Sequence, residues 1–345
     1  MSPEQQEVNV DAEGDLSPHP LTQRSSAFSF SPNDRKRGGT RAFKFGGSSL
    51  LGAERMLRAA RIVREAAMHH SVTVIVSAMK GVTDRLLRVA HLVKAEEWQT
   101  AAREADHIVQ LHLDTLADLQ LAEEDADRIE YELTLLGRDL LHETEPHHAS
   151  NIDRAAVDRL ASFGERLSAR LFAAVLEKVE LAAVPVSSSD FVLTCDDFQN
   201  AKPNLEQTRQ RGQEVLLPLL DAGIIPVVTG FIGATCDGRI TTLGRNSSDY
   251  SGAIIANVVD AEELVIWTDV DGIYTANPKE SAEAKLLHVM SYDDAHALAL
   301  SGAKVLHPQV LPLAAQTEMT VWVRNTFKPE NQGTRIGPND KGGVA

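Results

Sequence analysis

Hydrophobic positions alternate between two patterns along the chain. Short runs of β-branched residues without polar alternation, such as VTVIVS at 72–77, are typical of buried parallel strands. Stretches with an apolar residue every three or four positions, such as 50–68, predict helices. A short strand, AFKF at 42–45, precedes that helix, and the turn GGSS joins the two. The ordered chain is therefore predicted to begin with a strand, a glycine turn and a helix.

The same succession of elements continues towards the C-terminus. Residues 83–145 are rich in Leu, Ala, Glu and Arg and predict a helical insertion of two or three helices. The other predicted helices are 153–179, 205–221, 248–258 and 308–316, and the other predicted strands are 182–188, 224–231, 238–243, 263–270 and 318–325. Repeated strand–helix units predict an α/β fold, a three-layer α/β/α sandwich with a mainly parallel central sheet. Ligands of such sheets bind beyond the carboxyl ends of the strands.

Both ends of the chain lack this periodicity. Residues 1–40 are rich in Ser, Pro, Gly and charge, which predicts a disordered leader. We interpret its basic cluster, Arg35 to Arg37, as part of a solvated linker. The chain length allows two domains or one large α/β domain. We expect one catalytic domain over 41–336 and a flexible tail over 337–345.

Charge and composition narrow the classes of partner. The 345 residues carry a formal net charge of −15, which opposes binding to a polyanion, so nucleic acid is not an expected partner. No apolar run reaches the ~18 residues of a membrane-spanning helix. Acidic residues among the first 20 argue against a signal or transit peptide. Cys195 and Cys236 are too few for a disulfide framework. These features predict a cytoplasmic protein with no membrane partner.

The first candidate site is KFGGSS at 44–49, where the first strand leads into a helix. Paired glycines allow backbone N–H groups to approach an anion, and a helix N-terminus adds positive partial charge. The expected guest of Gly46, Gly47 and Ser48 is a phosphate, with Lys44 nearby. Neither a Walker A loop nor a GxGxxG fingerprint is present. A simple tight turn is the alternative.

The second candidate, VSAMKGVTD at 76–84, also lies between a strand and a helix. The hydroxyls of Ser77 and Thr83 could bind a carboxylate or a phosphate. Thr83 also suits the N-cap of the helix that follows, and one residue can serve both purposes.

The third candidate, TLGRNSSDY at 242–250, precedes an apolar helix. Arg245 offers a planar fork for a carboxylate. Ser248 and Asp249 stand where the helix begins, so a capping role is as compatible with them as a functional one.

The fourth candidate, WTDVDGIYTANP at 267–278, follows a buried strand. Thr268, Asp269 and Tyr274 at a strand end suit nucleotide recognition, and a hairpin turn is the structural alternative. The spacing lacks the later ligands of an EF-hand loop, which excludes that kind of calcium site.

Two other clusters do not support chemistry of their own. The histidines around 142–148 lack HExxH spacing, and Pro146 interrupts the helix that would align them. The hydroxyls of 187–190 have no positioned histidine to activate them. No protein metal site is therefore predicted.

Together these motifs resemble aspartate kinase, of the amino-acid kinase superfamily. The similarity runs in family order through about 41–336 and rests on KFGGSS, VSAMKGVTD, SFGERLSA, TLGRNSSDYSGA, WTDVDGIYTANP and GAKVLHP. The amino-acid sequences of these motifs are most like those of the kinase half of bifunctional aspartokinase–homoserine dehydrogenases. The sequence contains no dehydrogenase half.

The resemblance implies an activity and a division of labour. The family transfers the γ-phosphoryl group of ATP, with Mg²⁺, to the β-carboxylate of L-aspartate. The product, 4-phospho-L-aspartate, leads to lysine, threonine and methionine. The amino-acid site is expected in an N-terminal lobe and the nucleotide site in a C-terminal lobe from about residue 224.

The resemblance also implies residue roles. Lys44 and Asp249 match catalytic positions, and Lys44 is expected to contact the transferred phosphoryl group. The aspartate-site positions are Ser77, Thr83, Glu165, Arg245, Ser248 and Asp249, with Arg245 on the α-carboxylate and Glu165 on the α-ammonium. The nucleotide-site positions are Lys44, Gly46, Gly47, Ser48, Thr268, Asp269, Tyr274, Lys279, Lys304 and Val305.

Three departures from the family pattern affect these expectations. Asn246-Ser247 stands where the family often has Gly-Gly, and Gln199 stands where it has a glycine after Phe198. The chain also ends eleven residues after Thr334, so no ACT domain is expected. Feedback inhibition by lysine or threonine is therefore not expected from this polypeptide alone. A homodimer and a separate regulatory or dehydrogenase subunit stay open as partners.

Two alternative functions remain open. One is a kinase of the same superfamily that acts on another small carboxylate. Glu165 with Arg245 favours a free amino acid, because an N-acylated substrate would leave Glu165 without a cation. The other is a silent regulator that binds ATP or an amino acid, against which Lys44, Asp249 and Lys304 argue.

Overall fold

A computed structural model describes most of the chain. The described residues are 38–146, 152–276, 281, 283–300, 306–338 and the backbone of 343–344. The predicted leader therefore lies outside the described residues except for its last three positions. Those three belong to strand β1 (Gly38–Phe45), which begins earlier than the expected domain start at 41.

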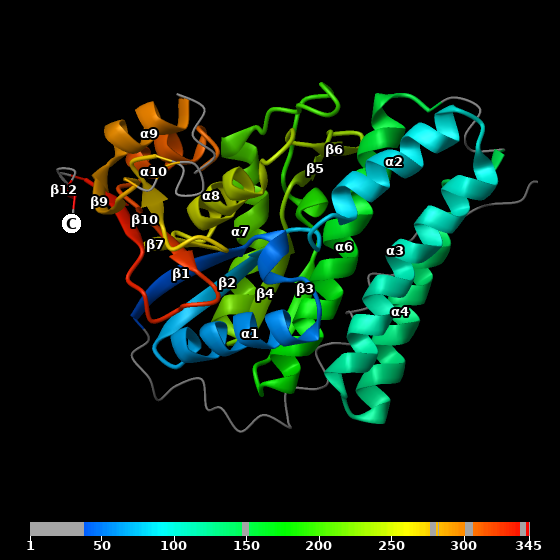
Figure 1. The fold of residues 1–345 in the computed structure, drawn as a ribbon, viewed down its shortest axis with the longest axis horizontal. Helices are drawn as coiled ribbons and strands as arrows, with labels where there is room; N and C mark the ends of the chain where they lie inside the picture. The colour runs from blue at the N-terminus through cyan, green and yellow to red at the C-terminus, as the bar shows by residue number, and fades with distance from the viewer. Residues whose placement is uncertain are drawn as a thin grey trace, which may run out of the picture. The chain divides into compact units, whose positions relative to one another are not determined.

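A ten-stranded sheet forms the centre of the fold (Figure 1). Its order is β12-β9-β11-β10-β7-β1-β2-β4-β3, with β8 paired to β9. Six neighbouring strands are parallel to one another, with β3 at the edge of the sheet: β1, β2 (His70–Val76), β3 (Ala183–Val186), β4 (Ile225–Thr229), β7 (Glu263–Thr268) and β10 (Thr320–Asn325). The remaining strands of this sheet are β8 (Ile273–Tyr274), β9 (Leu286–Ser291), β11 (Thr334–Gly337) and β12 (Gly343–Val344). A separate hairpin contains β5 (Ile232–Ala234) and β6 (Ile240–Thr242).

Helices cover both faces of the sheet, which confirms the predicted α/β/α sandwich. One face packs against α1 (Ala53–Ala67) and α6 (Arg154–Lys178), and the other against α7 (Leu205–Asp221), α8 (Ser248–Val258) and α10 (Val310–Gln316). Helix α9 (Tyr292–Leu300) lies beside α10 and β9.

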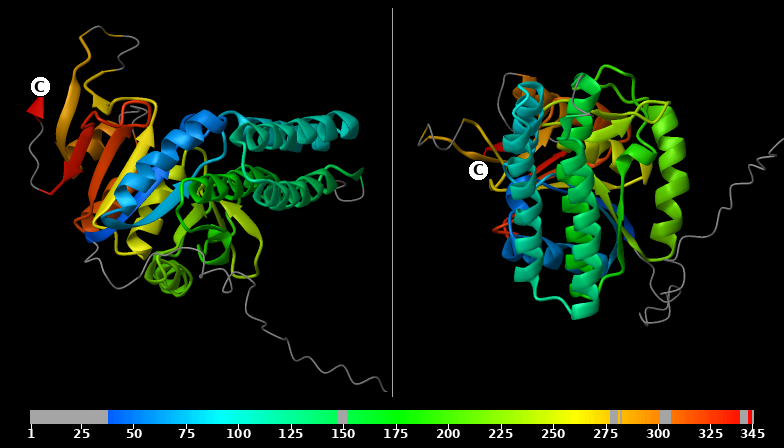
Figure 2. Two further views of the ribbon diagram at one scale, coloured as in Figure 1. Left: turned by 90° about the horizontal axis from the view of Figure 1, so that it is seen from below. Right: turned by 90° about the vertical axis from the view of Figure 1, so that its right-hand side faces the viewer.

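The predicted helical insertion consists of three helices. They are α2 (Val82–Lys94), α3 (Trp98–Leu119) and α4 (Glu123–His142), and they pack on one another and on α6. Figure 2 shows from a second direction that this insertion and strand β9 lie at opposite ends of the sheet.

Strand β1 is central because it pairs in parallel with both β2 and β7. Its side chains alternate between the two faces. Phe43 and Phe45 join the core under α1 and α6, where Phe45 stacks on Trp267 at 6.2 Å between ring centroids. Ala42 belongs to the core under α8. Lys44 shares the face of Ala42 because side chains alternate along a strand, so its ammonium must be accommodated beneath α8.

Several predicted elements agree closely with the structure, and several were missed. The helices 205–221 and 248–258 have the predicted bounds. Strands β5, β8, β9 and β11 and helix α9 were not predicted. Within the predicted tail, Gly343–Val344 pairs with β9, and 339–342 and 345 lie outside the described residues. No helix in the described part of the chain is long and apolar enough to cross a membrane.

Helix α3 buries a histidine that makes the stability of the fold dependent on pH. Nδ1 of His112 lies 2.7 Å from the carbonyl oxygen of Ile108, and Nε2 has no partner among the described residues. Burial lowers the pKa of His112 from 6.5 to about 4, because the charged ring would lose its water. The unfolded chain therefore binds more protons between these values, and stability falls as the pH falls from about 6.5 towards 4.

We expect His112→Leu to reduce this acid sensitivity. Between pH 7.5 and pH 5, His112 should cost the wild type about 2 kcal/mol of unfolding free energy that the variant does not lose. Urea denaturation at both pH values measures the difference. His107→Gln, at an exposed position of the same helix, is the control and should behave as the wild type. Equal pH dependence of the wild type and His112→Leu would refute the assignment.

Candidate active site

An ion pair between a buried lysine and a partly buried aspartate lies at the carboxyl end of β1. Nζ of Lys44 is 2.6 Å from Oδ1 of Asp249, in the first turn of α8, and Lys44 is only 6% exposed. Gly252 lets α8 approach, since a Cβ added there would lie 3.3 Å from Cβ of Lys44. The structure thus joins two residues that are 205 positions apart in the sequence.

The glycine turn lies directly beside this pair. Gly46 N–H donates to the carbonyl of Trp267, and a Cβ at Gly46 would lie 3.6 Å from the Lys44 ammonium nitrogen. A Cβ at Gly47 would lie 2.5 Å from the carbonyl oxygen of Ala78, so a side chain there requires a backbone shift. Gly47 is therefore needed for space, whereas Gly46 has an ordinary extended φ of −73° and a Cβ there would make only van der Waals contacts.

Glu165 has a buried carboxyl group, of which only one oxygen has a hydrogen-bond partner among the described residues. It lies in α6, is 3% exposed, and its Oε1 accepts a hydrogen bond of 3.0 Å from the N–H of Ala78. Its Oε2 has no hydrogen-bond partner in the described part of the chain. Burial raises the pKa of Glu165 to about 8, although the Ala78 N–H and the Lys44 charge oppose the rise. A cationic donor that reaches Oε2 would complete the hydrogen bonding of this carboxyl group. It would also lower the pKa and so restore the negative charge.

Two hydroxyls near the ends of the strands are also buried without partners. Within the described residues neither Oγ of Ser77, after β2, nor Oγ of Ser247, before α8, forms a hydrogen bond. Ser248 lies close by, since a Cβ at Gly230 would be 3.0 Å from the Val76 carbonyl oxygen and 3.5 Å from Cβ of Ser248. Unsatisfied buried hydroxyls are uncommon in folded proteins, and a ligand atom or an ordered water is one way to satisfy them. Sequence reasoning gave Ser247 no role.

The helix-capping alternatives are wrong for three of the candidate residues. The N-cap of α2 is Gly81, in the left-handed conformation with φ of 87°, so Thr83 does not cap that helix. The N-cap of α8 is Ser247 rather than Ser248 or Asp249.

Arg245 lies at the exposed rim of the same region. Its guanidinium is 2.7 Å from a carboxylate oxygen of Asp84, which follows Thr83 in α2, and both side chains are 75% exposed. Gly244 and Asn246 on either side of it have positive φ values of 94° and 63°. A substrate carboxylate could exchange with Asp84 at little cost, because exposed ion pairs contribute little to stability.

The predicted nucleotide positions are only partly brought together. Thr268 directly follows Trp267, whose carbonyl holds Gly46, so the end of β7 adjoins the glycine turn. Thr268 donates a long hydrogen bond of 3.4 Å to the carboxylate of the exposed Asp269. Tyr274 belongs to β8, where burial raises its pKa. The predicted residues Lys279, Lys304 and Val305 lie outside the described residues.

His307 is a neighbour of the site that sequence reasoning did not single out. Its ring stacks on Tyr250, with 5.5 Å between centroids and 10° between planes. Burial lowers the pKa of His307, while the negative charge of Asp249 opposes that effect. Its only sequence signal is its place in the motif GAKVLHP.

The described residues of the site offer few ligands to a metal ion. The described residues contain no group of three or more His, Cys, Asp or Glu side chains that could hold a metal. Mg²⁺ in phosphoryl-transfer sites is held by one or two carboxylates together with nucleotide phosphates and water. Asp249 is a carboxylate of that kind beside the glycine turn.

Comparison with known proteins places the chain in a family. The profile of the amino acid kinase family matches residues 40–325, so the chain belongs to that family. It is similar to the lysine-sensitive aspartokinase 3 of Escherichia coli, with 32% identity over 293 residues, or 85% of this chain and 63% of that protein. The chloroplastic aspartokinase 3 of Arabidopsis thaliana is also 32% identical, over 92% of this chain and 56% of its own length.

A solved structure agrees with these sequence matches. Escherichia coli aspartokinase III in complex with aspartate and ADP superposes with a TM-score of 0.79 and 32% identity, covering 86% of this chain and 64% of that one. A bifunctional aspartokinase/homoserine dehydrogenase of Arabidopsis thaliana is 29% identical, so these relatives do not favour a bifunctional origin over a monofunctional one. The chain spans between 32% and 63% of the length of these curated relatives.

Glu165 generates a stability prediction that is opposite in sign to that of His112. Its pKa is raised on folding from 4.5 to about 8, so its contribution to stability is complete below about pH 4.5 and is lost as the pH rises through 8. Between pH 5.5 and pH 8 the ligand-free wild type should lose about 3 kcal/mol that Glu165→Gln does not lose.

Urea denaturation of both proteins at the two pH values measures this difference. Glu130→Gln, at an exposed position of α4, should retain the wild-type pH dependence. If Glu165→Gln loses as much stability as the wild type, the carboxyl group is not buried in the way described.

Proposed function

We propose that the protein is an aspartate kinase, which transfers the γ-phosphoryl group of ATP to the β-carboxylate of L-aspartate. One observation carries the proposal. A buried carboxyl group with a free oxygen, Glu165, lies within electrostatic reach of a buried ammonium group, Lys44, and its ion pair with Asp249. The first suits an amino-acid ammonium and the second suits a phosphoryl group. The aspartate and ADP bound in the similar Escherichia coli enzyme support both assignments.

The chemistry requires positioning rather than a strong base. A carboxylate is already ionised at neutral pH and attacks phosphorus directly, so the protein must align the reactants and stabilise negative charge. Lys44 would contact the transferred phosphoryl oxygens, and Asp249 holds its ammonium group in place. The N–H groups of Gly47 and Ser48, in the turn next to Lys44, could donate to phosphate oxygens, whereas the Gly46 N–H already donates to the Trp267 carbonyl. Mg²⁺, bound with ATP, would neutralise phosphate charge.

Substrate selection would come from the residues around Glu165. Oε2 of Glu165 would accept from the α-ammonium, and the hydroxyls of Ser77 and Ser247 would donate to carboxylate oxygens. Arg245 would leave Asp84 to bind the α-carboxylate. The remaining predicted contacts, Thr83 and Ser248 for aspartate and Thr268, Asp269, Tyr274, Lys279, Lys304 and Val305 for the nucleotide, belong to this proposal.

The wider setting is also part of the proposal. The product would feed lysine, threonine and methionine synthesis, in line with the resemblance. Cys195 and Cys236 are exposed and unpaired, which fits a reducing compartment such as the cytoplasm. The division into an amino-acid lobe and a nucleotide lobe, and a second copy or a separate dehydrogenase or regulatory subunit as partner, stay predictions.

Acyl-phosphate trapping tests the activity. Purified protein with MgATP and hydroxylamine should release ADP and form aspartyl hydroxamate with L-aspartate, and neither with L-glutamate, N-acetyl-L-glutamate or no acceptor. Turnover with another acceptor alone would keep the family chemistry and reject aspartate as substrate. ATP binding without turnover on any acceptor would favour the silent regulator.

Lys44→Ala should reduce turnover by about 10²–10³ or more, because a charged transition-state donor is lost. Lys94→Ala, at the exposed C-terminus of α2, is the matched control and should retain full activity. Steady-state ADP release measures both. Wild-type turnover by Lys44→Ala would remove Lys44 from the mechanism.

Arg245→Ala should raise the KM for L-aspartate by about tenfold or more, because a bidentate contact to the substrate carboxylate is lost. Asp84→Ala is the control, since it breaks the same ion pair but keeps the guanidinium. Its KM should stay equal or fall. An equal rise of KM in both variants would mean that the KM for L-aspartate depends on the ion pair between Arg245 and Asp84 and not on carboxylate binding by Arg245.

A further inference from the structure

A second cavity lies between α6 and the end of β3, apart from the candidate active site. Its volume is about 340 Å³, which is within the range of small-molecule sites. The lining residues are Arg166, Ala169, Arg170, Pro185, Val186, Ser187, Ser189, Asp190, Thr229 and Ile240. None of them is a predicted site residue, and the neighbouring Glu165 reaches Ala78 instead.

Two arginines on consecutive turns of α6 supply positive charge to this cavity. Burial lowers the pKa of both Arg166 and Arg170, and the charge of Arg170 lowers that of Arg166 further. Each arginine has a carboxylate partner at the outer limit of an ion pair, with Arg166 4.0 Å from Asp139 and Arg170 3.8 Å from Glu132. The Arg170 guanidinium donates one hydrogen bond, to the backbone carbonyl of Arg166. The Arg166 guanidinium lies over the Phe163 ring, 4.6 Å from its centroid, and donates no hydrogen bond to the described residues.

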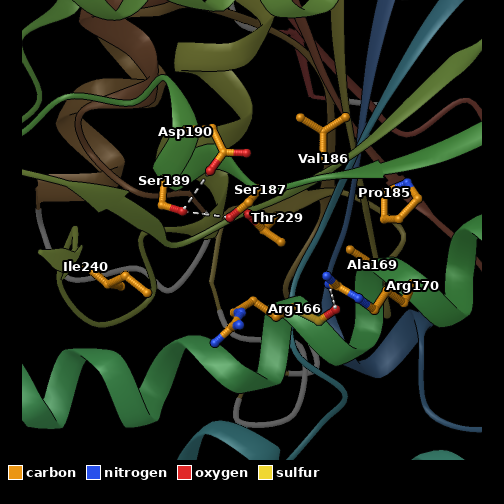
Figure 3. A pocket seen from close by; sticks show the side chains of 10 residues that line it. All are labelled: Arg166, Ala169, Arg170, Pro185, Val186, Ser187, Ser189, Asp190, Thr229 and Ile240. Atoms are coloured by element: carbon orange, nitrogen blue, oxygen red, sulfur yellow. Dashed lines mark hydrogen bonds between the residues drawn. The ribbon is translucent and has the colours of Figure 1, made fainter. Parts of the chain in front are cut away.

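A carboxylate faces the arginines from the other wall. Figure 3 shows Asp190 and the two serines on the η3 segment (Ser188–Asp190) and its approach, opposite the arginines of α6. Asp190 accepts a long hydrogen bond of 3.5 Å from Ser189 and forms no ion pair with either arginine in the described structure. The negative charge of Asp190 therefore acts on both arginines across the cavity without a direct ion pair in the described structure.

The rest of the lining sets the size and polarity of an occupant. Ala169, Pro185, Val186 and Ile240 form an apolar part of the wall. The hydroxyls of Ser187 and Ser189, 2.7 Å apart, stand beside Asp190 and can donate or accept. A molecule that complements all three parts has an anionic end, a cationic group and an aliphatic portion.

We propose that this cavity binds a free α-amino acid with an aliphatic side chain. Its carboxylate would lie on Arg166 and Arg170, its ammonium on Asp190, and its side chain against the apolar wall. A zwitterion suits the cavity because it can meet the arginines and Asp190 at once, whereas a simple anion would place a second negative charge near Asp190. The site is independent of the proposed phosphoryl transfer and goes beyond it.

Isothermal titration calorimetry on the full chain tests the proposal with L-leucine, L-valine and L-methionine. Isocaproate, which is leucine without its amino group, and isoamylamine, which is leucine without its carboxylate, are the matched ligands. The variants are Arg166→Gln and Asp190→Asn, with Arg211→Gln on the exposed side of α7 as control. Lys44→Ala alters the candidate active site but not this cavity, so it tests whether binding occurs in the cavity.

The expected result is saturable binding of at least one of the three amino acids. Removal of either charged group from the ligand, or of either charge from the protein, should weaken binding at least about tenfold. Arg211→Gln and Lys44→Ala should bind as the wild type does. Amino-acid binding in the cavity is expected even if the kinase proposal fails, because this binding does not involve Lys44.

Three results would overturn the proposal: no saturable binding of any of the three amino acids, undiminished binding to both cavity variants, or loss of binding in Lys44→Ala. Thermal melting of each variant reports whether it folds. If a variant does not fold, the comparison of leucine with isocaproate and isoamylamine on the wild type decides the question alone.

Discussion

The burial of one ammonium group in the middle of a sheet constrains the rest of the molecule. A charge without water costs several kcal/mol unless an opposite charge meets it. Lys44 stands on a strand that is flanked on both sides, so no water reaches it through the sheet. Asp249 is the group that meets it, which requires α8 to begin at the carboxyl end of β1. Gly252 permits the close packing that this position demands.

Around that ion pair the protein keeps polar atoms without partners. Glu165, Ser77 and Ser247 each bury an atom that forms no hydrogen bond within the described structure. Such groups reduce stability, and natural proteins retain them chiefly where function requires them. Their arrangement around Lys44 and the glycine turn is why we interpret this region as a preformed substrate site.

The local pattern of hydrophobic residues was sufficient to predict most of the parallel strands and the helices that pack on them. Continuous β-branched runs identified β2, β4 and β7, and apolar spacing gave α7 and α8 their bounds. Strands β8 and β11 were missed because they are only two and four residues long, and β9 was missed although it is six residues long, since it pairs in parallel with the distant β11. No local signal marks partners that are distant in the sequence.

Some residues of the candidate site could be predicted from the sequence alone, and others could not. Lys44 and the glycines had a signal of their own, at a strand–turn–helix junction. Glu165 came only from the family resemblance, because it lies inside a helix that is buried along most of its length. The lack of a partner for Ser247 and the facing charges of Arg166 and Asp190 depend on packing and could not be predicted from the chain alone.

The most direct test of the central claim is the number of protons released when L-aspartate binds. Calorimetry at pH 7 in buffers of different ionisation enthalpy measures that number. A Glu165 pKa of about 8 in the free protein means that an ammonium on Oε2 should release about 0.9 proton. Glu165→Gln should abolish the release. Aspartate binding with no release, or with the same release in Glu165→Gln, would contradict the account.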